Sequence, residues 1–238
     1  MIEIKGLSKY YGDFPALQDV NFRIETGEVA GLLGLNGAGK TTCLRILTGY
    51  LLPTDGEVRI DGIDVFARPI EIKQKIGYLP ETPPLYPELT VEDYLRFVAR
   101  MRGLPEREFP DEFMRVTEIA QLAAARRSQI RHLSLGFRKR VGIAQALIGS
   151  PPVLIFDEPI SGLDPRQIVE MRQLIRSLAG KHTILISSHI LTEVSQTCDR
   201  VVVIHNGRFT GELAGSELSD LESKFMEMTS GSPAAVGR

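Results

Sequence analysis

Short apolar runs alternate with longer amphipathic segments along most of this chain, and the order predicts strands that alternate with helices. Predominantly apolar runs are typical of strands that are buried on both faces. They occur at Val29–Leu33, Val153–Phe156, Thr183–Ser188 and Arg200–His205. The pattern predicts an α/β fold with a mainly parallel core sheet, in which ligands sit outside the carboxyl ends of the strands.

The first part of the chain has a different pattern. From Ile2 to about Ile24 apolar and polar residues alternate in short pieces, which is typical of half-exposed strands. Two further short runs, Glu57–Ile60 and Ile63–Phe66, flank Asp61-Gly62, a strong hairpin signal. These stretches predict an N-terminal antiparallel β subdomain beside the core sheet.

Helical periodicity dominates residues of about 88–150, which we interpret as a helical subdomain inserted between core strands. It begins at Thr90, where a capping-box-like sequence precedes the first apolar face. Another helix is predicted to start at Asp164-Pro165, with an acid at the N-cap and proline at the first position. We expect one domain over residues 1–215 and a partly flexible C-terminal extension over 216–238.

Composition and charge narrow the function only slightly. The length of 238 residues suits one α/β domain, and 43% hydrophobic with 24% charged residues is ordinary for a globular protein. A net charge of −2 gives no general attraction to nucleic acid, so no nucleic-acid partner is expected. With neither a signal-peptide pattern nor an apolar run of about 20 residues, we expect a cytoplasmic protein.

The segment Gly34–Thr41 matches the phosphate-binding pattern G-x-x-x-x-G-K-[ST] at every fixed position, after a predicted strand and before a predicted helix. Glycines let successive backbone N–H groups and the helix N-terminus approach an anion closely. We therefore predict a site for ATP and Mg²⁺, in which Lys40 contacts the β- and γ-phosphates and Thr41 binds the metal. The predicted nucleotide-binding residues of this segment are Gly34, Leu35, Asn36, Gly37, Ala38, Gly39, Lys40, Thr41 and Thr42.

Two other core strands end in residues that suit the same chemistry. The run Val153–Phe156 leads directly into Asp157, a candidate magnesium ligand, and Glu158, a candidate general base for the attacking water. The strand at Thr183–Ser188 ends at His189, which we predict contacts the γ-phosphate. Taken singly, the acid pair suits a strand-end turn and the histidine suits a packed side chain; their common sheet edge favours a catalytic site with Lys40, Glu158 and His189 as its catalytic residues.

With these motifs in this order, the sequence resembles the ATP-binding subunit of ATP-binding cassette (ABC) transporters over about residues 2–228. The further motifs that carry the resemblance are Tyr11, Glu81, Leu133–Phe137 and Ser161–Asp164. The resemblance implies that Tyr11 stacks on adenine, although taken alone it suits a partly buried strand residue. It also implies that Ser134 and Gly136 cap the γ-phosphate of ATP held by a second subunit, and that Asp164 contacts across that dimer.

The sequence departs from the family pattern at two places. Leu135 and Phe137 replace the third and fifth residues of the usual Leu-Ser-Gly-Gly-Gln signature, although Ser134 and Gly136 are kept. Glu81 stands where the family usually has Gln, and its carboxylate is a hard oxygen ligand suited to Mg²⁺ or the water. Together with residues 78–86 and the tail 221–225, this resembles the multidrug, polysaccharide and gliding-motility-type exporter branch.

The resemblance implies an ATPase that works as a homodimer or pseudo-dimer of cassettes, held at the inner face of the cell membrane by an integral membrane permease. An alternative is a soluble ABC-type ATPase switch without a permease, acting on ribosomes, metal-cluster assembly or DNA. A nucleotide kinase is a second alternative, but it would need an acceptor site and lid arginines. The single P-loop, the lack of a coiled-coil pattern and the signature-like segment favour the transporter subunit.

Overall fold

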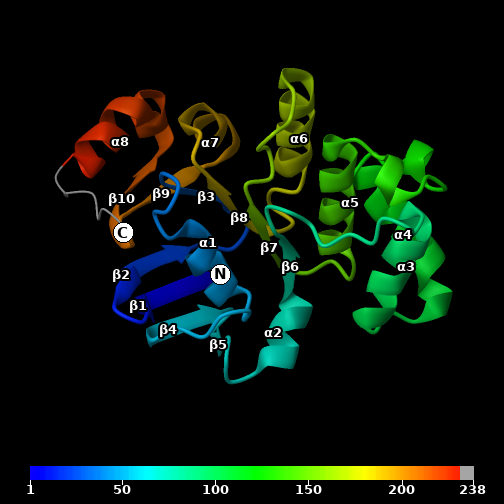
Figure 1. Cartoon of the computed structure of the whole chain (residues 1–238), viewed down its shortest axis with the longest axis horizontal. Helices are drawn as coiled ribbons and strands as arrows, with labels where there is room; N and C mark the ends of the chain where they lie inside the picture. The colour runs from blue at the N-terminus through cyan, green and yellow to red at the C-terminus, as the bar shows by residue number, and fades with distance from the viewer. Residues whose placement is uncertain (231–238) are drawn as a thin grey trace.

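In the computed structural model, which describes residues 1–230, a six-stranded sheet runs through the middle of the molecule (Figure 1). In spatial order its strands are β10 (Arg208–Ala214), β9 (Arg200–His205), β3 (Val29–Leu33), β8 (Thr183–Ser188), β7 (Val153–Asp157) and β6 (Ile76–Leu79). Neighbouring strands are parallel except at one edge, where β10 pairs antiparallel with β9. The predicted, mainly parallel core sheet is therefore confirmed.

A separate four-stranded antiparallel sheet lies beside this core, as predicted for the N-terminal part. Its spatial order is β2 (Phe14–Ile24), β1 (Ile2–Tyr11), β4 (Asp55–Ile60) and β5 (Ile63–Asp64). Asp61 and Gly62 form the predicted hairpin turn with positive φ angles of 49° and 78°. The second strand of that hairpin is shorter than predicted, because the Asp64 carboxylate accepts hydrogen bonds from the N–H groups of Phe66 and Ala67 and turns the chain.

Helices pack against the core sheet, and further helices extend the molecule to one side (Figure 1). They are α1 (Lys40–Leu47), α2 (Pro69–Lys75), α3 (Val91–Met101), α4 (Phe109–Ile119), α5 (Leu135–Leu147), α6 (Pro165–Ser177), α7 (Leu191–Thr197) and α8 (Leu221–Thr229), with short 3-10 turns at Glu106–Glu108, Ala123–Ala125, Ile130–His132 and Gly215–Asp220. The predicted caps are confirmed, since Thr90 accepts from the Asp93 N–H at 3.1 Å and Asp164 from the Gln167 N–H at 2.9 Å. Figure 1 shows α3 and α4 on the side away from the antiparallel sheet, with α5 between them and the core.

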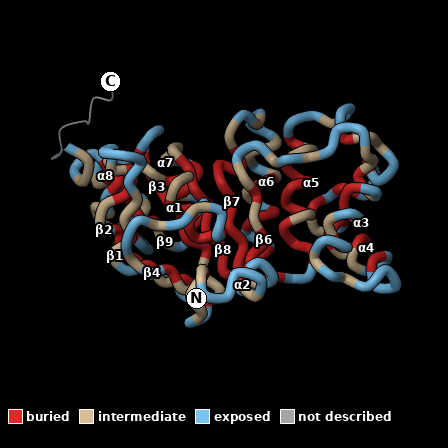
Figure 2. The backbone as a smooth tube through the Cα atoms, turned by 60° about the horizontal axis from the view of Figure 1, so that its bottom comes forward, coloured by how far each residue is buried: buried red, intermediate tan, exposed pale blue. Residues whose placement is uncertain are grey.

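The core sheet supplies side chains to two hydrophobic cores, one on each face. In Figure 2 the strands β3, β7 and β8 in the middle of the molecule are coloured as buried. Strand β3 illustrates the division: Ala30 and Leu32 belong to the core that contains the antiparallel sheet and α1, while Val29 and Leu33 belong to the core that contains α3, α4 and α5. Successive side chains of a strand point to opposite faces, so an apolar run is needed to serve both. Each fully buried Leu or Val side chain stabilises the fold by about 1.5–3 kcal/mol.

The chain after β10 packs back on the core. Leu221 and Phe225 of α8 are buried and join the core cluster on that face, beside β10 and α7. Of the predicted, partly flexible extension at 216–238, the stretch 231–238 lies outside the described residues. The proposed division at residue 215 stays a prediction, as does the boundary of the helical subdomain at 88–150.

Candidate active site

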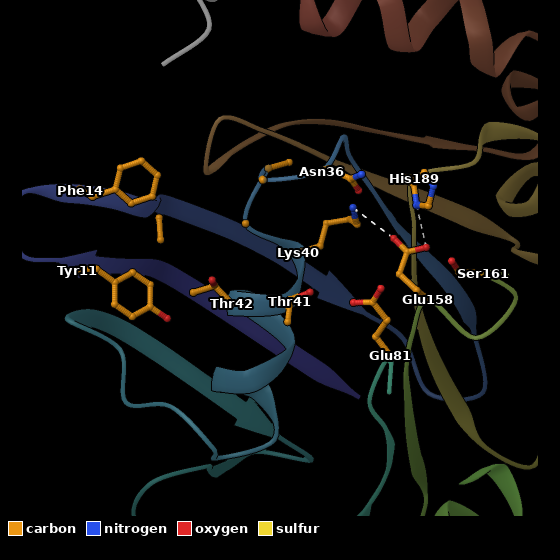
Figure 3. Close-up of a pocket in the computed structure, with 14 residues that line it drawn as sticks. Tyr11, Phe14, Asn36, Lys40, Thr41, Thr42, Glu81, Glu158, Ser161 and His189 are labelled. Atoms are coloured by element: carbon orange, nitrogen blue, oxygen red, sulfur yellow. Dashed lines mark hydrogen bonds and ion pairs between the residues drawn. The ribbon is translucent and has the colours of Figure 1, made fainter. Parts of the chain in front are cut away.

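A cleft of about 720 Å³ opens at the carboxyl end of the core sheet (Figure 3). It is lined by Tyr11, Phe14, Ala16, Asn36, Gly37, Ala38, Gly39, Lys40, Thr41, Thr42, Glu81, Glu158, Ser161 and His189. The residues after β3, β6, β7 and β8 therefore meet in one place, as the parallel sheet requires. A volume of this size lies in the range of small-molecule sites.

The loop between β3 and α1 forms a cradle of backbone N–H groups. Gly37 and Gly39 have φ angles of 80° and 104°, a region that side chains with a Cβ rarely adopt. A Cβ at Gly34 would lie 2.4 Å from the Ile204 carbonyl oxygen, and one at Gly39 would lie 2.7 Å from that of Ala16. These close approaches explain why glycine is needed there. The loop ends at the N-terminus of α1, whose free N–H groups and dipole suit a phosphate.

Lys40 places its ammonium group at the bottom of this cradle. The side chain is only 6% exposed, and its Nζ donates to the carbonyl oxygens of Gly34 (2.7 Å) and Leu35 (3.3 Å). The same Nζ lies 3.4 Å from Glu158 Oε1 (Figure 3). A buried cation held in this way is positioned to bind phosphate oxygens and is linked to the candidate base.

Glu158 follows β7 and is held by several contacts. Its φ angle of 48° is unusual for a non-glycine residue and costs on the order of 1–3 kcal/mol. Its N–H donates to Ser187 Oγ (2.9 Å), and its Oε2 lies 3.0 Å from His189 Nδ1. The carboxylate therefore faces the cleft between Lys40 and His189 (Figure 3), where it suits a general base.

Asp157, the last residue of β7, is 1% exposed and accepts a hydrogen bond from Ser187 Oγ (2.5 Å). Burial raises the pKa of Asp157, whereas hydrogen bonds from Ser187 and Thr41 oppose this shift. The contact with Thr41 brings the two predicted metal ligands together. A hydroxyl and a carboxylate beside a phosphate cradle are the donor set that Mg²⁺ takes in nucleotide sites, where it keeps water and phosphate oxygens as its other ligands.

Glu81 lies after β6 and lines both the main cleft and a neighbouring hollow of about 560 Å³ that Asp157 also lines. Figure 3 shows its side chain on the same side of the cleft as Thr41 and Glu158. Residues 1–230 contain no cluster of three or more His, Cys, Asp and Glu side chains suited to hold a metal by themselves. A magnesium ion at Thr41, Asp157 and Glu81 would therefore depend on phosphate oxygens, in agreement with the preference of this ion.

Two exposed aromatic side chains form the outer end of the cleft. Tyr11 is 48% exposed and Phe14 is 52% exposed, and the two residues face each other in the register of β1 and β2. Figure 3 shows both rings across from Thr42. Phe14 was not among the predicted residues, but the two-residue turn Gly12-Asp13 carries the signal, because it makes Tyr11 and Phe14 direct partners across the hairpin.

Ser134, Gly136 and Asp164 do not line the cleft formed by the described residues. Gly136 and Asp164 line a separate hollow of about 230 Å³, together with Phe137 and Gln167. Ser134 is the N-cap of α5 and accepts a hydrogen bond from the Phe137 N–H (3.3 Å). Leu135 and Phe137, the two departures in the signature, are each 40% exposed.

Lys139 and Ser187 contact the site residues but were not predicted from the sequence. Lys139 Nζ donates to the carbonyl oxygen of Glu158 (2.6 Å), and Ser187 bridges Asp157 and Glu158. Lysine in a helix and serine in a strand are common, so the residue types carry no signal. For Lys139 the only sequence signal is its position among the buried residues of a helix. A lysine at such a position needs a partner.

Comparisons with known proteins agree with this geometry. The profile of the family described as "ABC transporter" matches residues 17–161. A bacitracin transport ATP-binding protein of Bacillus licheniformis is 40% identical over 229 residues, which cover 95% of this chain and 74% of that protein. A lantibiotic transport ATP-binding protein of Streptococcus pyogenes is 38% identical over 226 residues, which cover 94% of this chain and 96% of that protein.

Among solved structures, the fold matches a dimeric ATP-binding cassette in a post-hydrolysis state bound to ADP and Pi, with a TM-score of 0.81 and 26% identity over 90% of this chain and 98% of that one. The predicted α/β cassette fold is therefore confirmed.

Proposed function

This chain belongs to the ABC transporter family and is an ATPase of that family, and from this premise we propose that two such cassettes hydrolyse ATP between them and drive a separate membrane permease. The observation that carries the proposal is the meeting of the phosphate cradle, Asp157, Glu158 and His189 at one edge of the core sheet. Phosphoryl transfer needs positioning and charge stabilisation more than covalent chemistry, and this edge supplies both.

Each residue of the cleft has a proposed role. Backbone N–H groups of residues 34–39 and the N-terminus of α1 hold the phosphates, and the Lys40 ammonium stabilises the charge that develops on the γ-phosphoryl oxygens. Glu158 accepts a proton from the attacking water, while His189 orients the Glu158 carboxylate and contacts the γ-phosphate. Tyr11 and Phe14 offer apolar ring faces on which adenine stacks.

Thr41 and Asp157 would hold Mg²⁺, with Glu81 as a third oxygen donor. When bound, the metal would supply positive charge that neutralises part of the charge of the phosphates. In this chain the hydrogen bond from Ser187 keeps Asp157 directed toward Thr41, so the two donors stay in place before the substrate binds.

The positions of Ser134 and Gly136 support a site shared between two chains. Both lie outside the cleft of their own chain, at the N-terminus of α5, where Ser134 is exposed and Gly136 is buried. A hydroxyl and the N–H groups of a helix N-terminus suit an anion. They would cap the γ-phosphate held by a facing cassette. Asp164, which already caps α6 in its own chain, would lie at the same interface.

Trapping the dimer tests this proposal. Glu158→Gln protein should keep its ATP, because only the base is lost, and should run as a dimer on size exclusion with ATP and Mg²⁺ and as a monomer without them. Adding Ser134→Arg should abolish the dimer, since bulk then fills the place of the γ-phosphate. In the wild type, ATPase activity per subunit should rise with protein concentration until dimers saturate.

Ser216→Arg is the matched control, because Ser216 is exposed near the C-terminal end of the described chain. This change should leave the ATP-dependent dimer intact. Glu158→Gln protein that stays monomeric at saturating ATP, or wild-type activity that is independent of concentration, would contradict the shared site.

An exposed apolar surface next to the cleft suits the permease. A hollow of about 550 Å³ between the core and α3 is lined by Tyr50, Tyr78, Pro84 and Met101, among others. Tyr50 is 78% and Met101 73% exposed, large values for apolar side chains. Tyr86 is 49% exposed and is linked to this hollow through Tyr94, whose ring lies 6.0 Å from the Tyr86 ring and whose hydroxyl donates to Gln145 of the lining. A short permease helix would bury these side chains and favour one docked position.

Tyr86→Asp should release the cassette from membranes that contain its permease, because a desolvated carboxylate is costly in an apolar contact. ATPase activity of the purified chain should stay within about twofold of the wild type, since Tyr86 does not line the nucleotide cleft. Membrane fractionation with the neighbouring genes expressed measures the first effect. Met226→Asp, at an exposed residue of α8, is the control and should remain membrane-bound. A wild-type chain that stays in the supernatant under these conditions would favour the switch without a permease.

The permease would also set the cellular position and the cargo. Within the described part of the chain, none of the helices combines the length and apolar character that a membrane crossing requires. We propose that the permease holds the chain at the inner face of the cell membrane. The relatives named for bacitracin and lantibiotic transport support a cargo of that kind.

A further inference from the structure

We propose that Lys139 is a positioning residue for hydrolysis, which fixes the backbone of Glu158 and links that base to the signature end of α5. This inference rests on the proposed role of Glu158 as the base and adds a residue that acts through it. Lys139 does not line the nucleotide cleft of the described chain, so it has no direct contact with the reacting atoms.

The contact is short and buried. Lys139 lies in α5 and is 3% exposed, and its Nζ donates to the Glu158 carbonyl oxygen at 2.6 Å. Charge-assisted hydrogen bonds of this length are stronger than those between neutral groups, and a buried ammonium has no water to compete for it. The bond joins two segments that are 19 residues apart in the sequence and belong to different elements.

The held carbonyl belongs to a residue whose backbone needs support. Glu158 has a φ angle of 48°, which only surrounding contacts can maintain. Ser187 Oγ accepts from its N–H (2.9 Å), and its carbonyl accepts from Lys139 Nζ (2.6 Å) and from the Ser161 N–H (3.3 Å). Both peptide groups that flank the Cα are therefore fixed, and with them the direction in which the carboxylate leaves the chain.

Several carboxylates surround the Lys139 ammonium. Burial lowers the pKa of Lys139 from its usual value, and the carboxylates of Glu81, Glu158, Glu193 and Asp157 oppose this shift. Glu81 adds a negative charge to the acidic group around the base. A buried ammonium opposite these carboxylates reduces their mutual repulsion, so they can lie close together without rearranging.

The position of Lys139 in α5 gives the contact a second consequence. The helix begins at Ser134, which would cap the γ-phosphate held by the facing cassette, and Lys139 follows between one and two turns later. One rigid helix thus contacts the partner's nucleotide at its start and the base of its own chain shortly afterwards. Docking of the partner would adjust the Glu158 backbone through this contact.

A double-mutant cycle with Lys139→Met and Glu158→Gln tests the inference. Lys139→Met keeps the length of the side chain but removes the donor, and the Ser161 N–H still pairs the carbonyl, so the fold should persist. We expect kcat to fall about 10- to 100-fold, because small misplacement of a catalytic group has effects of this size, with the KM for ATP within about threefold. In the Glu158→Gln background, measured in single turnovers, the same change should have no further effect.

Three measurements separate positioning from general damage. The ATP affinity of Lys139→Met should match that of the exposed control Lys181→Met, and its thermal midpoint should fall but stay above the assay temperature. The Lys139→Met/Glu158→Gln protein should still form the ATP-dependent dimer, because Ser134 and Gly136 are untouched. Lys139→Gln retains a donor, although a shorter and neutral one. Its kcat should also fall, but less than that of Lys139→Met.

Several results would overturn the inference. A wild-type kcat in Lys139→Met would do so, and so would an equal loss of rate in the Glu158→Gln background or loss of the ATP-dependent dimer. If Glu158 is not the general base, the result is different, because Glu158→Gln alone would then hydrolyse ATP at the wild-type rate.

Discussion

Glu158→Gln is expected to slow ATP hydrolysis by about 10²–10⁴-fold, the range that a positioned general base contributes. The amide has nearly the shape of the carboxylate, but it cannot accept a proton from water. ATP and Mg²⁺ should still bind, since the phosphate cradle, Thr41 and Asp157 are unchanged. Phosphate release measures the rate, and equilibrium binding of ATP measures the retained affinity.

Glu222→Gln is the control for this change, because Glu222 lies exposed on α8. It should hydrolyse ATP at the wild-type rate. If Glu158→Gln protein also kept its full rate, another group would have to take the proton, and the structural setting of Glu158 between Lys40 and His189 would need a different explanation.

Lys40→Ala should weaken ATP binding and abolish hydrolysis. Removing a buried charge-assisted donor costs about 2–4 kcal/mol, which corresponds to a rise in Kd of about 30- to 1,000-fold. Hydrolysis should suffer further, because in the proposed mechanism the same ammonium stabilises charge that grows in the transition state. Calorimetric titration with ATP measures the affinity, and phosphate release measures the activity.

Lys181→Ala, at an exposed lysine, should retain both properties. Unchanged turnover in Lys40→Ala would remove the assignment of residues 34–41 as the phosphate site. Weakened ATP binding with a wild-type turnover rate would also contradict the proposed role of Lys40. Some other group would then have to stabilise the charge of the transition state.

The sequence predicts the centre of this site well because each position there has a strict chemical requirement. Gly34, Gly39 and Lys40 are fixed by close backbone approach and by charge, so the pattern is recognisable without a structure. Asp157 and His189 are found by position, because each comes at or just after the end of an apolar run and such runs in parallel sheets end at a common edge. The order of the strands across the sheet needed the structure.

Contacts between distant segments could not be predicted in the same way. Ser187 holds Asp157 from a strand 30 residues later, and no residue type or spacing indicates that pair. The hairpin after Gly62 was predicted too long, because the side chain of Asp64 competes for backbone N–H groups that a strand would otherwise pair. Strand propensity alone does not predict such a side-chain hydrogen bond, because the bond depends on the local geometry.

The sharing of the six-stranded sheet between two hydrophobic cores has a consequence for how the protein unfolds. Val91, Leu95 and Phe113 of the helical part lie in one contiguous cluster with Phe156 and Ile184 of the sheet. Separating these helices from the six-stranded sheet would therefore expose one face of the sheet. The other face of the same strands is part of the second core. Neither part has a closed interior of its own, so the free energy of unfolding belongs to the cassette as a single cooperative unit.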